Sequence, residues 1–130
     1  MKAVVIDASL AMAFLMSDEV VDEEIERAIT DNEIKMYVPP VFESELFNGI
    51  LTAYRRDRLT WRESILTIST YERLLVEEKR IDLTEVMKLA RKHGLTFYDA
   101  SYVWLARKLK VELLTGDKKM REVVWSKAHN

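Results

Sequence analysis

The chain has 130 residues, which suits a single domain over residues 1–130 with a hydrophobic core of its own. Its composition, 48% hydrophobic and 32% charged, excludes a disordered chain, and the absence of cysteine excludes disulfides, thiolate metal sites and cysteine nucleophiles. The formal net charge of −2 argues against a protein that coats DNA, which would usually be basic, but leaves local binding of a strand open.

The predicted elements alternate between strands and helices along the whole chain. Residues 2–6 are rich in β-branched side chains and lack polar alternation, as in a central parallel strand. Ser9 and Asp18 are suitable helix N-caps, Pro39 ends the second strand, and Gly94 ends a helix. In chain order we expect strands at 2–6, 36–38 and 111–115 and helices at 9–16, 18–31, 41–57, 61–77, 83–93, 97–109 and 118–125, with room for a further strand near 79–81.

This order favours a parallel sheet that is covered by helices on both faces. We therefore predict an α/β fold, a three-layer α/β/α domain with a central, mostly parallel sheet of about four or five short strands. The opening residues 1–6 meet Asp7 too soon for a signal peptide, and no apolar run is long enough to span a membrane. We expect a cytoplasmic protein.

Four acidic residues, Asp7, Glu45, Asp99 and Asp117, follow or flank apolar segments, where an isolated charge is costly. Asp7 directly follows the first strand, and Asp117 comes shortly after the last one. At ~4 Å, two carboxylates repel by roughly 4 kcal/mol at an effective dielectric constant of about 20. If the four converge, a positive ion must lie between them, and a hard divalent cation with oxygen ligands is the natural candidate.

The predicted geometry brings these acids toward one place. Ligands of open parallel sheets bind beyond the carboxyl ends of the strands, so Asp7 and Asp117 share an edge if their strands are neighbours. At about 100° per residue, Glu45 lies beside the apolar strip of its helix, and Asp99 shares a stripe with Tyr102. Both helices therefore direct a carboxylate toward the core or its border.

Each acid also has a purely structural interpretation. Asp117 is a good N-cap for the last helix, and Asp99 can form a capping box with Thr96. Asp7 can begin the turn into the first helix, and Glu45 can extend to water. Capping does not exclude metal binding, so both interpretations stay open.

Four short motifs carry these acids in a fixed order. They are Val5-Ile6-Asp7-Ala8-Ser9, then Glu45 with Asn48 three residues on, Thr96-Phe97-Tyr98-Asp99-Ala100, and Leu114-Thr115-Gly116-Asp117. In this order they resemble the motifs of PIN-domain ribonucleases, specifically the VapC toxins of prokaryotic toxin–antitoxin pairs. The resemblance covers essentially the whole chain.

The resemblance implies a PIN-like domain that hydrolyses RNA phosphodiester bonds with Mg²⁺ or Mn²⁺, as the toxin of a type II VapBC pair. It also implies a homodimer and a VapB-type antitoxin that inhibits it. By this resemblance the metal-binding and catalytic residues are Asp7, Glu45, Asp99 and Asp117, supported by Ser9, Asn48 and Thr115.

Basic and aromatic residues add weaker signals. Lys118, Lys119 and Arg121, just beyond Asp117, could contact RNA phosphates. Solvated helix faces explain most of the other basic residues. Tyr98, Tyr102 and Trp104 could stack on bases, or belong to the core or an interface. The other basic groups are Arg55, Arg56 and Arg58, then Lys88, Arg91 and Lys92, and then Arg107, Lys108 and Lys110.

Two other functions stay open. A receiver-like phospho-acceptor domain also gathers aspartates around Mg²⁺, but here Glu45 and Asp99 lie on predicted helices rather than at strand ends. A catalytically silent PIN-like interaction module would not need its four acids intact. P-loop and dinucleotide-binding domains do not fit, because the three glycines form no motif.

Overall fold

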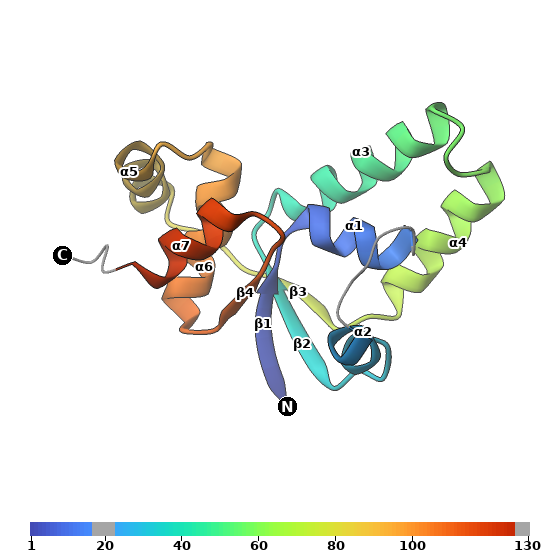
Figure 1. The fold of residues 1–130 in the computed structure, drawn as a ribbon, viewed down its shortest axis with the longest axis horizontal. Coiled ribbons are helices and arrows are strands. Elements are labelled where there is room, and N and C mark those ends of the chain that lie inside the picture. Colours follow the sequence, from blue (N-terminus) through green and yellow to red (C-terminus); the bar gives the residue numbers. More distant parts are fainter. Residues whose placement is uncertain (17–22, 127–130) are drawn as a thin grey trace.

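A computed structural model describes residues 1–16 and 23–126, and in this part of the chain strands alternate with helices (Figure 1). The elements are β1 (Lys2–Ile6), α1 (Ala8–Met16), α2 (Glu23–Thr30), β2 (Ile34–Val38), α3 (Phe42–Arg55), α4 (Trp61–Glu72), β3 (Val76–Glu78), α5 (Leu83–His93), α6 (Phe97–Leu109), β4 (Glu112–Leu114) and α7 (Lys118–Trp125).

The sheet has four parallel strands in the order β3-β2-β1-β4. β1 lies in the middle, where Val4 pairs with Met36 on one side and with Glu112 on the other. Val4 and Val5 are fully buried, as the unbroken apolar run of this strand predicted. Because the chain passes from β1 to β2 and later returns to the other side of β1, strand order reverses between β1 and β4.

Helices cover both faces of the sheet. α6 packs on β1 and β4, with α5 and α7 against it, whereas α1 packs with α3 and α4 on the other side (Figure 1). The predicted three-layer α/β/α fold is therefore confirmed, and its sheet is parallel throughout. None of the helices described here combines the length and hydropathy that a membrane crossing requires.

A close helix contact sets the geometry near the end of β1. A Cβ atom on Gly49 would lie 2.6 Å from Met12 Sδ, so the glycine lets α1 lie tightly against α3. Both helices start at the sheet and run outward together (Figure 1). Glu45 is one turn before Gly49 on α3, so this contact holds the turn that follows Glu45 close to α1.

Some predicted element boundaries were wrong. α1 begins at Ala8 rather than residue 9, and its cap is Asp7, not Ser9. α4 ends at Glu72 rather than 77, because Val76–Glu78 form β3 beside β2, and the third strand therefore precedes 79–81. The helix predicted at 18–31 is seen as Glu23–Thr30, and its proposed cap Asp18 lies outside the described residues.

Candidate active site

Asp7 is held rigidly at the carboxyl end of β1. Its side chain is buried, with the residue 7% exposed. One carboxylate oxygen, Oδ1, accepts the backbone N–H of Leu10 at 2.9 Å, and Oδ2 accepts the hydroxyl of Thr115. Its own backbone N–H donates to the Leu114 carbonyl at 3.1 Å. Asp7 is thus both a helix cap and a fixed carboxylate at the edge of the sheet.

Thr115 links Asp7 to Asp117. β1 and β4 are neighbours, with Ile6 opposite Leu114, so the condition for a shared edge is confirmed. The buried Thr115 hydroxyl donates to Asp7, and its oxygen accepts the backbone N–H of Asp117 at 3.0 Å. Asp117 in turn caps α7 by accepting the Met120 N–H at 2.9 Å, which confirms its structural interpretation without removing its free carboxylate oxygen.

Glu45 is oriented by a residue whose role the sequence did not reveal. The buried Tyr102 hydroxyl donates to Glu45 Oε1 at 2.7 Å, which ties the first turn of α3 to α6. Tyr102 was interpreted as a core or base-stacking residue, and it is a core residue with a polar end. Its position three residues after Asp99 on one helical stripe was the available signal.

Asp99 completes the group from the first turn of α6. Thr96 caps this helix by accepting the Asp99 N–H at 3.0 Å. Each of the four acids therefore either caps a helix or lies in a helix's first turn. The positive ends of four helix dipoles, those of α1, α3, α6 and α7, reduce the cost of gathering negative charge here.

The four acids interact electrostatically, and these interactions shift the pKa values of three of them. Burial, and then the charges of Asp99 and Asp117, raise the pKa of Asp7. Burial, and then the charges of Asp99 and Asp7, raise the pKa of Glu45. The pKa of Asp99 is raised by burial and by Asp117. Hydrogen bonds from Thr115, Tyr102 and Thr96 oppose these shifts.

We call Asp7, Glu45, Asp99 and Asp117 the acid cluster. As the side chains stand, no three acidic or histidine side chains within residues 1–16 and 23–126 are arranged to enclose an ion. The acid cluster is therefore open, with carboxylates that lie within electrostatic range but are not closed around a centre.

The other predicted site residues take different positions. Thr115 is part of the acid cluster's hydrogen bonding, whereas Ser9 and Asn48 are exposed on α1 and α3. Three basic residues of α7 all have protein partners. Lys118 pairs with Glu122 at 4.0 Å, Lys119 donates to the Gly94 carbonyl at 3.3 Å, and Arg121 donates to the Thr115 carbonyl at 2.8 Å.

Comparison with known proteins decides the family, because residues 4–125 match the PIN domain. The chain belongs to the PIN-domain family. It is 32% identical over 120 residues to ribonuclease VapC9 of Mycobacterium tuberculosis, covering 92% of this chain and 89% of the relative. It is 34% identical over 122 residues to ribonuclease VapC3 of Pyrobaculum aerophilum, covering 91% and 92%.

Two solved structures share the fold. The crystal structure of PAE2754 from Pyrobaculum aerophilum has a TM-score of 0.69 and 25% identity, covering 94% of this chain and 79% of that one. VapC20 of Mycobacterium tuberculosis, a sarcin-ricin loop cleaving toxin, has a TM-score of 0.59 at 12% identity, with 88% and 91% covered, and supports the fold alone. The chain thus belongs with the VapC ribonucleases, and the predicted class, an RNA-cleaving toxin of a VapBC pair, is confirmed at this level.

Proposed function

We propose that the acid cluster binds Mg²⁺ or Mn²⁺ and hydrolyses RNA phosphodiester bonds within a strand. One observation carries the proposal: carboxylates from four separate elements gather beyond the carboxyl ends of β1 and β4, where strand order reverses. This is where open parallel sheets bind their ligands. Helix capping alone would not require these four carboxylates to lie close together.

The donor chemistry fits a hard cation. The acid cluster offers only carboxylate oxygens, which Mg²⁺ and Mn²⁺ prefer, and the chain has no cysteine that would favour a softer metal. A nearby cation would favour the ionised carboxylates and so oppose the raised pKa values of Asp7, Glu45 and Asp99. Binding would require modest side-chain rotation, for which the longer Glu45 and the less buried Asp117 are suited.

The roles that we assign to the four acids follow from how deeply each one is buried. When bound, the ion supplies an activated water and charge stabilisation at the phosphate. Asp7, fixed by hydrogen bonds at both oxygens, is the anchor, and Tyr102 keeps Glu45 directed at the same centre. Asp99 and Asp117 are more accessible, so either can accept a proton from the attacking water. Direct attack by water, without the RNA 2′-hydroxyl, leaves a 5′-phosphate product.

Sequence similarity to VapC ribonucleases supports three further proposals. We expect a VapB-type antitoxin as the inhibitory partner, a homodimer as the assembled form, and the cytoplasm as the location. This similarity also argues against the receiver-like alternative, whose chemistry is phosphotransfer to an aspartate.

The test is cleavage of a mixed RNA pool by the purified protein in EDTA, in Mg²⁺ and in Mn²⁺, with the new ends sequenced. We expect cleavage only with a divalent ion, and ends that carry a 5′-phosphate. Equal cleavage in EDTA would contradict the metal requirement, and ends with a 2′,3′-cyclic phosphate would contradict attack by water. A protein that cleaves no RNA with either ion would be the silent interaction module.

A further inference from the structure

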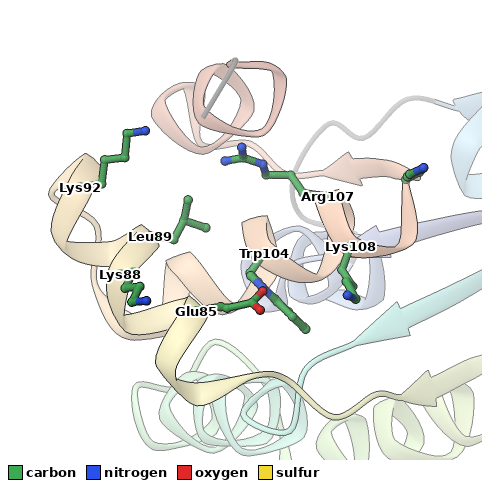
Figure 2. A pocket seen from close by; sticks show the side chains of 8 residues that line it. Glu85, Lys88, Leu89, Lys92, Trp104, Arg107 and Lys108 are labelled. Atoms are coloured by element: carbon green, nitrogen blue, oxygen red, sulfur yellow. The ribbon is translucent and has the colours of Figure 1, made fainter. Parts of the chain in front are cut away.

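A second polar site lies away from the acid cluster, between α5 and α6. It is a cavity of about 510 Å³ (Figure 2). Lys88 and Lys92 on α5 and Trp104 and Arg107 on α6 line its two sides (Figure 2). This volume is in the usual range for a small-molecule site. We call it the basic cavity, and the lining residues that matter are Lys88, Lys92, Trp104, Arg107, Lys108 and Lys110.

The charge of the basic cavity is strongly one-sided. Glu85 is the one carboxylate among its lining residues, and it already accepts the indole N–H of Trp104 at 2.8 Å. Lys88 and Lys108 have no carboxylate partner within residues 1–16 and 23–126. The basic side chains outnumber this one carboxylate, and such an excess of positive charge favours an anionic ligand.

Arg107 strengthens this argument because one of its donors has no partner. Its Nη1 is buried and has no hydrogen-bond acceptor in the described part of the chain. Burial also lowers the pKa of the guanidinium. A guanidinium donor that is buried without an acceptor is costly, so a rotation of Arg107 that brings this donor to a phosphate oxygen in the cavity would be favoured by a charge-assisted bond.

Positive charge continues from the basic cavity toward the acid cluster. Burial, and then the charges of Lys92, Arg107 and Lys119, lower the pKa of His93 at the end of α5, so these cations lie near one another around this end of the helix. Lys119 belongs to the helix that Asp117 caps. On α6, Arg107 is eight residues beyond Asp99, which is about 12 Å along the helix. One RNA strand can therefore reach both places.

We propose that the basic cavity binds a nucleotide of the RNA substrate that flanks the cleaved bond, with its phosphate at Lys88, Arg107 and Lys108 and its base against Trp104. Trp104 favours a nucleotide over an acidic protein segment, because bases stack on aromatic rings and carboxylates do not. This inference rests on the proposed function for the identity of the substrate as RNA, but not for the metal chemistry.

The test is RNA binding, measured in EDTA with the Asp7→Asn protein so that no cleavage intervenes. The affinity for a fluorescently labelled RNA oligonucleotide is compared with that of the same protein carrying Lys88→Gln and Lys108→Gln. We expect about tenfold weaker binding at physiological salt, and a salt slope smaller by about 1.4, since each lost contact to a single strand removes about 0.7.

The control carries Arg62→Gln and Arg73→Gln instead. These exposed residues change the net charge equally but belong to α4 and its end, on the far side of the molecule from α5 (Figure 1). The control should bind RNA within twofold of the parent. Equal losses in both variants would overturn the proposal, because they would show a general charge effect, and unchanged binding by the Lys88 and Lys108 variant would overturn it directly.

Trp104 provides a second readout. With Trp61→Phe and Trp125→Phe in the Asp7→Asn protein, it is the remaining tryptophan. We expect RNA to change its fluorescence, and the change to disappear with Lys88→Gln and Lys108→Gln. If poly-glutamate changes the fluorescence and RNA does not, the cavity serves an acidic protein segment and the proposal is wrong. A failure of metal-dependent cleavage would leave both EDTA measurements intact, so the two proposals fail separately.

Discussion

The acid cluster and the basic cavity are opposite in charge and also in construction. The acid cluster is made of short carboxylates at strand ends and helix N-termini, and Asp7 is fixed by bonds to the backbone and to Thr115. The basic cavity is made of long, exposed side chains such as Lys88 and Lys108, which lie on the surfaces of two helices. Only the acid cluster can hold a ligand in one geometry, whereas the basic cavity can adapt to ligands of many shapes.

The two kinds of construction suit different functions. A cluster of repelling charges around a fixed carboxylate such as Asp7 suits a reaction centre, because part of its geometry is set before the substrate arrives. Flexible cations around an aromatic ring suit sequence-tolerant binding of a strand. We propose that the acid cluster performs the reaction and that the basic cavity binds the strand, and the variants below separate these contributions.

The largest effect should come from neutralising the acid cluster. Asp7→Asn or Asp99→Asn should reduce metal-dependent RNA cleavage by at least about a thousandfold, because each removes a charged oxygen that would hold the ion. The measurement is initial cleavage rate in Mn²⁺, with circular dichroism as the check on folding. Glu43→Gln is the matched control, since this exposed carboxylate on the same helix as Glu45 bonds to Tyr71 and should leave the rate unchanged. Full activity of either Asp variant would refute the site.

The same cluster should be destabilising without metal. The pKa of Asp7 is raised above its ordinary 3.8, so its ionisation opposes folding. As the pH rises from below 3.8 to above the folded-state pKa of Asp7, the unfolding free energy of the parent should fall relative to that of Asp7→Asn. Above the folded-state pKa this difference in unfolding free energy should stay constant. We expect the variant to melt a few degrees higher in EDTA at neutral pH, where about 1 kcal/mol corresponds to roughly 4 °C.

Metal should reverse that order in a thermal melt. Mn²⁺ should raise the melting temperature of the parent and have little effect on Asp7→Asn, because a ligand stabilises the state that binds it. If EDTA leaves the parent as stable as the variant, the carboxylates do not strain the fold.

A smaller effect separates orientation from stability. Tyr102→Phe removes the hydrogen bond to Glu45, and Tyr71→Phe removes the corresponding bond to Glu43. Each should cost about 1 kcal/mol of unfolding free energy, measured in urea. Only Tyr102→Phe should also lower kcat, by about tenfold, because Glu45 loses its orientation. Equal loss of activity in both variants would mean that Tyr102 acts through stability alone.

The smallest effect is expected far from both sites, at Glu77 of β3. Hydrogen bonds from Lys79 and then Lys35 lower its pKa to about 2. A lowered carboxyl pKa stabilises the fold above the ordinary value of 4.5, and this contribution is lost as the pH falls toward 2. Glu77→Gln should therefore be slightly less stable than the parent at pH 7 and equal to it near pH 2, in low salt. A difference that persists at pH 2 would show that packing, not charge, is responsible.

Local chemistry explains which features the sequence predicted. β1 has an unbroken apolar run, and α5 and α6 have helical periodicity with strong end signals such as Gly94, so their bounds were predicted correctly. The end of α4 was missed because Val76 joins β3 only through its pairing with β2, which is tertiary information. The four acids were found because each lies within a recognisable short motif.

The rest of the site could not be found in this way. Tyr102 acts on Glu45 through a contact across the fold, at a sequence separation of 57 residues. The resemblance named Thr115 as a supporting residue, but its bond to Asp7, across 108 residues, was not predicted. The basic cavity joins Lys88 to Arg107 through the packing of α5 on α6, and on each helix alone these residues look like an ordinary solvated face. Short motifs identify functional residues that are close in sequence. The orientation of Glu45 and the assembly of the basic cavity depend instead on how the helices pack.

The most direct test of the central claim is the anomalous signal of Mn²⁺ in crystals of the parent grown with that ion. The account predicts a peak bounded by oxygens of Asp7 and at least one of Glu45, Asp99 and Asp117, at about 2.1 Å, and its loss in Asp7→Asn crystals. Well-ordered crystals with saturating Mn²⁺ and no peak between these side chains would contradict it.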